Sequence, residues 1–409
     1  MAEASGSGAA EAFRAVGFPW RLYSGVGALD QLRDEVVRQR ARRAFVICGQ
    51  TVANQTNLLQ RIRDGLGELY GGAFDRMDKD STYPAAVAGT AAAREAGADL
   101  IIAVGGGSVI VGARAVAIFL GEKGDPYELM TQYPEGKPAV SPRLLAPKLP
   151  IINVPTTPTS AMNRAGTGLK NDRLDHRMEF FDPKTRPVAL FWDAEALLTA
   201  PLWLARSTGT TTYTGSLHSV ANGSVNPLVE GDHLQAFRLA SRALPRLVAA
   251  PDDPGPRIDL CAAAFLQNRA ADDGAAREGR DPAASAAYAL ATALHVRYDS
   301  VGQGEATSAV TPAAIRRLGA ARGDGIRRMA EALGVGGAGT PETAADAAAD
   351  ALAAAYRGVE MPSRVRDLGI PEAELPLLAA DTLKNFNANR GARPDDQVER
   401  MLELLRAAW

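Results

Sequence analysis

The stretch over residues 99–120 constrains the fold of this chain more than any other. Residues 100–104 are apolar and mostly branched, as in a strand buried on both faces of a parallel sheet. The run is followed by three glycines, Gly105, Gly106 and Gly107. An Ala-rich helix is predicted over 109–120, with Ser108 as its N-cap. A strand, a glycine turn and a helix N-terminus let an anion approach the backbone, so the stretch predicts a diphosphate cradle for a dinucleotide. It lacks the Gly-x-Gly-x-x-Gly fingerprint, and a tight turn with nothing bound remains the alternative.

Strands and helices alternate along the first half of the chain. Residues 18–120 contain three strand-then-helix units, and a further strand is predicted over 149–154. Because this alternation builds a parallel sheet with helices on its faces, it predicts a Rossmann-like α/β domain over 18–200. Residues 177–181 and 188–192 are predicted to form a β pair that closes the sheet. Residues 1–17 are predicted to be a flexible tail, because they lack the charged and apolar regions of a signal peptide.

The second half has a different character. From residue 201 onward, apolar residues recur at helical spacing and almost nothing is typical of a strand. The predicted helices cover 228–250, 258–271, 283–294, 312–318, 325–333, 341–358 and 397–408. Residues 201–409 therefore predict an all-α helical-bundle domain.

Composition excludes several classes of partner. The chain has 409 residues and a net charge of −2, without a long basic run, which argues against nucleic acid and anionic membranes as partners. It has no uncharged apolar run long enough to span a membrane. Its two cysteines, Cys48 and Cys261, lie in apolar stretches and are predicted to be buried free thiols, as in the reducing cytoplasm. We therefore expect a cytoplasmic protein that acts on a small molecule.

Two further turns are predicted to complete the cofactor site. Gly49 ends the strand over 43–48, where many nucleotide-binding folds place an acidic residue on the ribose 2′-hydroxyl. Without that carboxylate a 2′-phosphate is not repelled, which slightly favours NADP over NAD. The alternative is that Gly49 only forms the turn. The loop after the strand over 149–154 is predicted to form the second wall of the site, unless it is a structural turn. The residues assigned to binding here are Thr156, Thr157, Thr159 and Asn163, together with Arg177.

Short segments spread over the chain carry a resemblance to a known family. They are Gly-Val-Gly-Ala-Leu within 21–32, Ala-Val-Gly-Gly-Gly-Ser at 103–108, Val-Pro-Thr-Thr at 154–157, His218 with Asn-Pro-Leu at 226–228, and Gly-Glu-Ala at 304–306. Together they resemble the iron-containing alcohol dehydrogenases, whose fold is shared with dehydroquinate synthase and glycerol dehydrogenase. The resemblance covers nearly the whole chain. It implies a dinucleotide-binding domain, a helical catalytic domain, a nicotinamide cofactor in the cleft between them, and a homodimer.

The resemblance also implies a metal site, of which this chain keeps one ligand in four. The family's aspartate falls at Thr214, its first histidine is His218, its second falls near Tyr288 and its third at Gln303. Threonine, tyrosine and glutamine are poor donors for iron or zinc, which need several imidazole or carboxylate ligands. We therefore expect no metal. The cofactor loops differ as well, because Val111 and a position close to Arg114 replace the family's aspartate and lysine, and bulkier residues at 159–163 replace its glycine-rich loop.

Other side chains are expected to take over the role of the metal. By the resemblance, His218, Tyr288, Gln303 and Tyr213 surround the position of the lost ion. Reduction of a carbonyl without a Lewis acid needs a proton donor or hydrogen bonds to the developing oxyanion, and His218 or Tyr288 is predicted to act as general acid. Both residues also fit ordinary buried positions in a helical domain.

These observations predict a metal-independent, NAD(P)H-dependent reductase or dehydrogenase of a small carbonyl or alcohol. Two alternatives remain open: the same scaffold used for elimination, cyclisation or ring opening, and a binding protein without catalysis. The polar segment over 385–390 fits either a lining of the cleft or, more typically, a surface loop.

Overall fold

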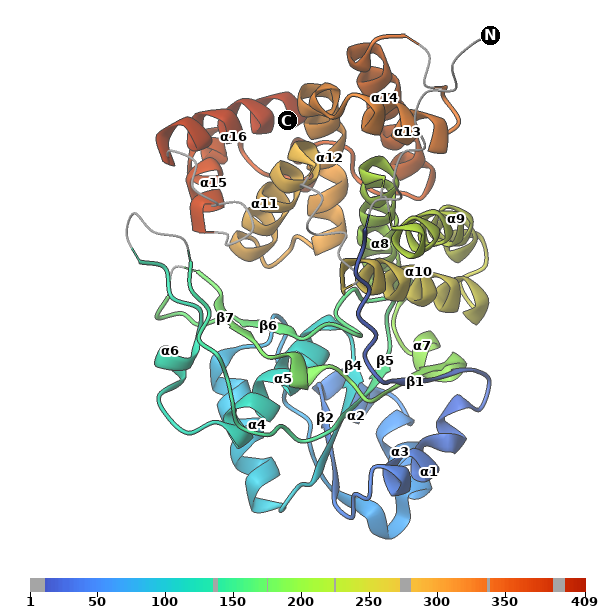
Figure 1. Cartoon of the computed structure of the whole chain (residues 1–409), viewed down its shortest axis with the longest axis vertical. Coiled ribbons are helices and arrows are strands. Elements are labelled where there is room, and N and C mark those ends of the chain that lie inside the picture. Colours follow the sequence, from blue (N-terminus) through green and yellow to red (C-terminus); the bar gives the residue numbers. More distant parts are fainter. Residues whose placement is uncertain are drawn as a thin grey trace, which may run out of the picture.

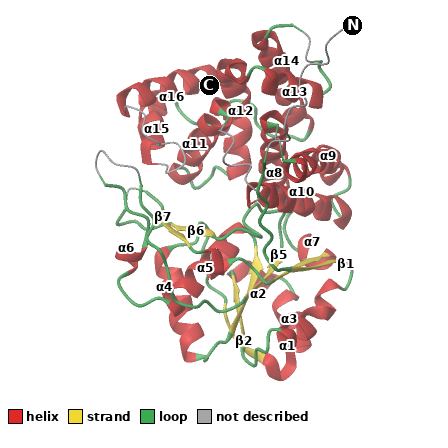
Figure 2. Ribbon diagram, in the orientation of Figure 1, coloured by secondary structure: helices red, strands yellow, loops and turns green. Residues whose placement is uncertain are grey.

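The computed structural model describes residues 12–134, 139–174, 176–223, 226–272, 281–336, 339–384 and 394–409. It contains a parallel sheet covered by helices and a helical half above it (Figure 1 and Figure 2). The strands in the described ranges all precede residue 194, and the described secondary structure after that point is helical, which confirms the predicted fold class. Residues 1–11 of the predicted tail and the segment over 385–390 lie outside the described residues.

The main sheet has six parallel strands in the order β1-β8-β5-β4-β2-β3. Their bounds are β1 Arg21–Gly25, β2 Ala44–Cys48, β3 Tyr70–Phe74, β4 Leu100–Gly105, β5 Ile151–Pro155 and β8 Ala189–Asp193. Every residue of β2, β4, β5 and β8 is buried, as the predicted branched apolar runs require. The strand order reverses at β4, which pairs with β2 on one side and β5 on the other. Such a switch point opens a crevice at the carboxyl ends of the strands.

Helices cover both faces of the sheet. One face packs against α1 Leu32–Arg38 and α3 Leu58–Leu66, and the other against α4 Tyr83–Glu95 and α5 Gly107–Gly121. Shorter helices complete this half, namely α2 Gln50–Gln55, α6 Pro126–Leu129 and α7 Ala194–Leu198. Both cysteines are free and buried, as predicted.

One prediction about the strands was wrong, and one strand was missed. The predicted pair of 177–181 with 188–192 does not form, because β7 Met178–Phe181 pairs antiparallel with β6 Gly166–Leu169 in a separate two-stranded sheet. Segment 188–192 instead enters the main sheet as β8, between β5 and β1. The edge strand β3 was missed, since its sequence Tyr-Gly-Gly-Ala-Phe contains two glycines, which are uncommon in strands.

The helical half begins with a long helix that periodicity alone did not reveal. This helix, α8 Leu202–Asn222, is rich in threonine, serine and glycine and has no continuous apolar stripe. The others are α9 Pro227–Ala249, α10 Pro254–Asp272, α11 Pro282–Arg297, α12 Gln303–Leu318, α13 Asp324–Ala332, α14 Pro341–Gly358, α15 Leu375–Asp381 and α16 Pro394–Ala408. The predicted start at Pro312 was wrong, because Pro312 lies inside α12. No helix in the described ranges combines the length and hydropathy that crossing a bilayer requires.

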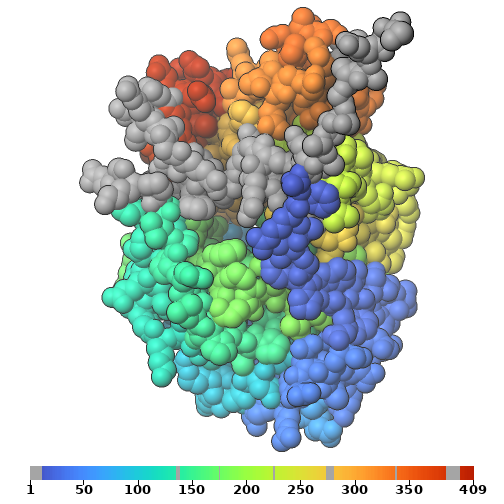
Figure 3. Space-filling model, in the orientation of Figure 1, coloured from blue at the N-terminus to red at the C-terminus, as the bar shows by residue number. Residues whose placement is uncertain are grey.

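The helical half contacts loops that follow the carboxyl ends of the strands. Thr212 of α8 donates a hydrogen bond to the carbonyl oxygen of Pro158, which follows β5, over 3.3 Å. Lys79, which follows β3, donates to the carbonyl oxygen of Asp299 over 2.6 Å. In Figure 3 the dark blue segment near the N-terminus lies across the boundary between the halves. There Trp20 packs edge-on against Phe265 of α10, with ring centroids 4.7 Å apart.

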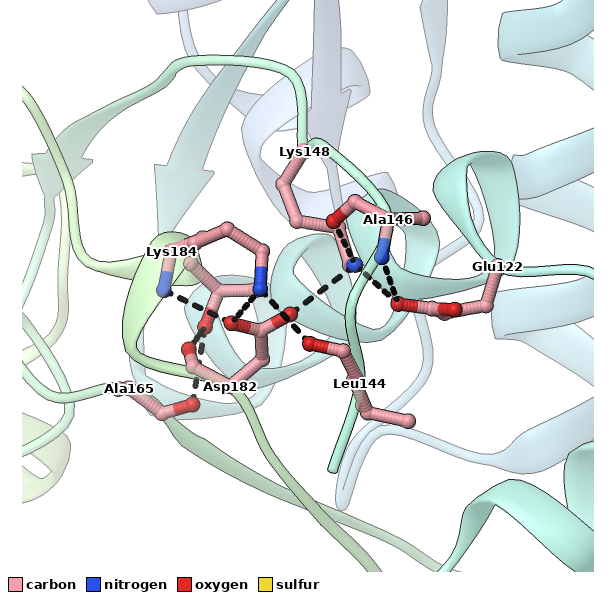
Figure 4. Close-up of polar contacts among 8 residues, drawn as sticks. Glu122, Leu144, Ala146, Lys148, Ala165, Asp182 and Lys184 are labelled. Atoms are coloured by element: carbon pink, nitrogen blue, oxygen red, sulfur yellow. Dashed lines mark hydrogen bonds and ion pairs between the residues drawn. The ribbon is translucent and has the colours of Figure 1, made fainter. Parts of the chain in front are cut away.

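A buried ionic network lies beneath the loops beside β5 (Figure 4). The ammonium of Lys148 has no solvent exposure and lies 2.6 Å from Glu122 and 3.0 Å from Asp182. Lys184, which is partly exposed, lies 2.9 Å from the other oxygen of Asp182. Thr185 donates to the carbonyl oxygen of Ala165, so the network is continuous with the loop that enters β6. The arrangement ties three separate loops to one another without using a group from the candidate site.

Candidate functional site

The glycine turn after β4 leaves the N-terminus of α5 without a side-chain cap. The N-cap is Gly106, which has no side chain to accept a hydrogen bond from the first turn. The prediction that Ser108 is the N-cap was therefore wrong, while its predicted role in cofactor binding stays a prediction. Its hydroxyl instead accepts a hydrogen bond from the backbone nitrogen of Asp80 over 3.0 Å, since Ser108 already lies inside the helix. The free N–H groups at this end of α5 are available to an anion.

Two threonines face this turn from the loop after β5. A Cβ at Gly106 would lie 3.4 Å from Oγ1 of Thr157, and one at Gly107 would lie 3.0 Å from Oγ1 of Thr159. Thr157 is buried, and its hydroxyl has no hydrogen-bond partner among the described residues. A buried hydroxyl without a partner is costly, and a bound acceptor would satisfy it. The turn and Thr157 thus form two sides of a site suited to a diphosphate. The backbone nitrogen of Thr156 donates to the carbonyl oxygen of Gly105 and holds the two sides together.

Strand register brings the third predicted cofactor element to the same edge. Cys48 pairs with Val104, and Gly105 pairs with Pro155, so Gly49 follows a strand end level with the glycine turn. A Cβ at Gly49 would lie 3.2 Å from the carbonyl oxygen of Met77. Gly49 caps the N-terminus of α2 without a side chain, so no carboxylate stands at this position.

Among the described residues, the hydrogen bonds of Asn163 and Arg177 are with α10 and with the loop after β3, and none is with the glycine turn. Asn163 donates to the carbonyl oxygen of Phe265 over 3.3 Å and accepts from Asn268, both in α10. Arg177 donates to the carbonyl oxygen of Asp80 over 2.9 Å. Asp80 belongs to the loop after β3, which also donates a hydrogen bond to Ser108 of α5. Asn163 therefore joins the two halves, and Arg177 supports the loop after β3.

The loop after β3 was not recognised from the sequence. Asp80 and Ser81 both have positive φ, 66° and 55°, which is uncommon for residues other than glycine. The carboxylate of Asp80 lies 3.1 Å from Nε2 of His295 in α11 and 3.6 Å from Arg177. Burial opposes ionisation of Asp80, but the hydrogen bond and charge of His295 and the charge of Arg177 outweigh it and lower its pKa to about 2. The loop thereby connects the start of α5 to the helical half.

Arg114 supports the loop after β5 from within the protein. Its side chain is buried, and it donates to the carbonyl oxygens of Ala161 and Ile110 over 2.9 and 3.4 Å. Burial, with the nearby charges of Arg164 and Arg186, lowers the pKa of Arg114 to about 9. The bulkier loop that replaces the family's glycine-rich segment is thus held through its backbone.

The four predicted catalytic residues do not form one cluster. His218 lies on α8 and is 8% exposed, with Nδ1 3.0 Å from the carboxylate of Asp281. Tyr288 on α11 is 46% exposed, and Gln303 is the exposed first residue of α12. The three residues come from three different helices, and Tyr288 and Gln303 are open to solvent.

The prediction for Tyr213 was wrong. Its ring is buried against Phe237 and Tyr356, with centroids 5.8 and 6.4 Å away, and burial raises its pKa to about 12. Five residues of helix turn a side chain by about 140°, so Tyr213 and His218 point to different sides of α8. Tyr213 is a core residue of the helical half.

The residues at the family's metal position do not fit a metal. The hydroxyl of Thr214, at the aspartate position, lies 2.6 Å from the hydroxyl of Tyr356 and donates to the backbone of Thr210. His218 is engaged through Nδ1 by Asp281, and Gln303 supplies only an amide. No group of three histidine, cysteine, aspartate or glutamate side chains suited to a metal occurs in the described part of the chain. One imidazole and the neutral oxygens of Thr214, Tyr288 and Gln303 are a poor set of ligands for iron or zinc.

Asp281 is the residue of this site that sequence reasoning missed. It precedes Pro282, and this Asp-Pro pair signals a helix start, which the structure shows as the N-cap of α11. No sequence signal connects it to His218, because the two residues are 63 positions apart.

Comparison with known proteins accounts for nearly the whole chain. The sequence profile of the iron-containing alcohol dehydrogenases matches residues 19–194, and the profile of the C-terminal part of the same family matches residues 217–409. Lactaldehyde reductase of Escherichia coli K12 is 26% identical over 391 residues, covering 94% of this chain and 97% of that protein. A crystal structure of 1,3-propanediol oxidoreductase has the same fold, with a TM-score of 0.81, 22% identity and coverage of 98% of this chain and 100% of that one.

An alcohol dehydrogenase from Oenococcus oeni also shares the fold, with a TM-score of 0.82, 19% identity and coverage of 96% and 98% of the two chains. The matches extend over both the sheet and the helical half, in one continuous order. The chain belongs to the iron-containing alcohol dehydrogenase family, a family of oxidoreductases.

Proposed function

We propose that this protein is a metal-independent, nicotinamide-dependent oxidoreductase that interconverts a small alcohol and its carbonyl compound. One observation carries the proposal: the uncapped N-terminus of α5 faces the buried, unpartnered hydroxyl of Thr157 across a glycine turn. This arrangement suits the diphosphate of a dinucleotide. The similarity of the chain to a lactaldehyde reductase, a 1,3-propanediol dehydrogenase and a long-chain-alcohol dehydrogenase supports the redox class.

NADP is the favoured cofactor in this proposal. Gly49 stands where a carboxylate would bind the ribose 2′-hydroxyl and repel a 2′-phosphate. When bound, the reduced nicotinamide supplies a hydride to the carbonyl carbon. Metal independence is supported by the donor set, since Thr214 is bonded to Tyr356 and His218 to Asp281.

A cytoplasmic homodimer is part of the same proposal. The buried free thiols of Cys48 and Cys261 support a reducing compartment, and the family resemblance supports the dimer.

Titration with NADPH and NADH, followed by the quenching of tryptophan fluorescence, tests the cofactor. We expect a micromolar dissociation constant for NADPH and weaker binding of NADH. Gly49→Asp is expected to weaken NADPH binding about tenfold or more, roughly 1.4 kcal/mol, because the carboxylate repels the 2′-phosphate. Absence of binding of either nucleotide up to millimolar concentration would contradict the redox proposal and favour the non-redox alternative.

Turnover then tests metal independence. Oxidation of NADPH at 340 nm is followed with a panel of small aldehydes and ketones, before and after dialysis against a chelator. The rate is expected to stay the same after dialysis and after addition of ferrous or zinc ions. A rate that disappears with the chelator and returns with one of these metals would overturn this part of the proposal.

A further inference from the structure

The pair formed by His218 and Asp281 has the geometry of a proton-transfer dyad. Nδ1 of His218 lies 3.0 Å from Oδ2 of Asp281. The other oxygen of Asp281 accepts a hydrogen bond from the backbone nitrogen of Ala283 over 2.9 Å, at the start of α11. Asp281 is 3% exposed, so its position is determined by the helix that it caps and by the imidazole.

The protonation of the pair follows from these contacts. A carboxylate only accepts hydrogen bonds, so Nδ1 of His218 carries the hydrogen between the two residues. In the neutral imidazole Nε2 then has the free lone pair, and in the imidazolium Nε2 carries a second proton.

Nε2 of His218 is the ring nitrogen that can exchange a proton with a substrate, because Nδ1 is bonded to Asp281. The residue is 8% exposed, and Nε2 is buried with no hydrogen-bond partner among the described residues. Thr214, one turn earlier on α8, is directed to Tyr356, so it does not share the imidazole. Half a turn before that, Thr212 contacts the loop after β5 that also carries Thr157. The same helix therefore carries His218 and contacts the second wall of the proposed cofactor site.

We propose that His218 is the proton-transfer residue of the reaction and that Asp281 positions it, in place of the metal of the family. This inference rests on the proposed redox function. In the oxidative direction, the alcohol oxygen gives its proton to Nε2 of His218 while the carbon gives its hydride to the oxidised nicotinamide. The C–H and O–H bonds of the alcohol break; the carbonyl double bond, the Nε2–H bond and a C–H bond on the nicotinamide ring form; and His218 returns the proton to water. In reduction the imidazolium donates that proton to the carbonyl oxygen. Asp281 holds the required tautomer and stabilises the imidazolium.

Asp281→Asn is the variant that tests the positioning role. Asparagine caps a helix as well as aspartate does, so the bond to Ala283 and the fold are kept. Its amide nitrogen, however, donates to Nδ1 and forces the hydrogen onto Nε2, which then cannot accept a proton. We expect kcat to fall by about 10²- to 10³-fold, within the range of general acid–base catalysis, with little change in KM or in the dissociation constant of NADPH.

His218→Ala tests the proton-transfer role independently. Its turnover is expected to fall by a similar factor and to recover partly with added imidazole, in a concentration-dependent way. A structural role would not produce that recovery. The matched control is His233→Ala, a buried histidine of α9 outside the site, whose turnover is expected to stay the same with and without imidazole.

The two proposals fail differently. If the unaltered protein binds neither nucleotide, the redox function fails, and with it this inference. If the unaltered protein binds NADPH and turns over, but Asp281→Asn keeps full kcat, the positioning role of Asp281 is wrong. If His218→Ala keeps full kcat, or loses it without any recovery by imidazole while remaining folded by circular dichroism, the role of His218 is wrong.

Discussion

Replacing Gly106 with valine is expected to raise the dissociation constant of NADPH about 100-fold, roughly 2.7 kcal/mol. The backbone at Gly106 is extended, with φ at −78°, so valine fits it without strain. A Cβ there would lie 3.4 Å from the hydroxyl of Thr157, which is ordinary contact. The valine methyl groups, however, would cover the free N–H groups at the start of α5, where the diphosphate is proposed to bind. Fluorescence titration measures the change.

Two further variants show whether the effect belongs to this site. Gly65→Val in α3 adds the same side chain where a Cβ has no neighbour within 4 Å, and is expected to leave NADPH binding unchanged. Thr157→Val removes the unpartnered hydroxyl with almost the same shape, and is expected to weaken binding about tenfold, as for a lost hydrogen bond to a charged group. Equal NADPH affinities in Gly106→Val and the unaltered protein would mean that the turn binds no diphosphate.

Replacing Lys148 with methionine is expected to lower the free energy of unfolding by about 3–5 kcal/mol, the cost of breaking a buried ion pair. Lys148 has no exposed surface, and its ammonium lies between the carboxylates of Glu122 and Asp182. Methionine keeps the length of the side chain but leaves both carboxylates without that cation. Urea unfolding at pH 7, followed by circular dichroism, measures the loss.

Lys184→Met is the matched control, because Lys184 contacts the same Asp182 but its side chain is 42% exposed. An exposed pair contributes about 0–1 kcal/mol, so a small loss of unfolding free energy is expected.

Burial opposes ionisation of Asp182, but hydrogen bonds from Lys184 and Lys148 outweigh it and lower its pKa. A carboxylate whose pKa is lowered in the folded state stabilises the fold fully above its pKa in the unfolded chain, about 4. That stability is lost as the pH falls through the lower pKa of the folded state. The difference between Lys148→Met and the unaltered protein should therefore shrink below about pH 4. An equal loss of unfolding free energy in both variants would mean that the burial of Lys148 does not strengthen its contribution to stability.

Local patterns predicted much of the fold and part of the candidate site. The apolar run that forms β4, the glycines of the turn and the start of α5 lie within one short stretch, so neighbouring residues suffice to specify them. The same holds for Gly49 at the end of β2. The capping role of Ser108 was wrong because α5 already begins at Gly107, which leaves the Ser108 hydroxyl to accept a hydrogen bond from Asp80.

Contacts between distant segments escaped prediction. The pairing of β7 with β6 rather than β8 depends on which strand edges meet in space, and the short strands carry no signal for it. Tyr213 looked like a site residue from its position near Thr214, but the direction of its side chain depends on how α8 packs against α9 and α14.

Residue patterns at short spacing predicted the fold class, and segments spread over the chain carried the resemblance to the family. Which groups meet at the site depends on the tertiary structure. Folding brings Asp281 to His218 across 63 residues, turns Thr214 toward Tyr356 and leaves Thr157 facing the glycine turn. The physical reason is that the partner of a polar side chain is chosen by the packing of whole helices and strands, which no local pattern encodes.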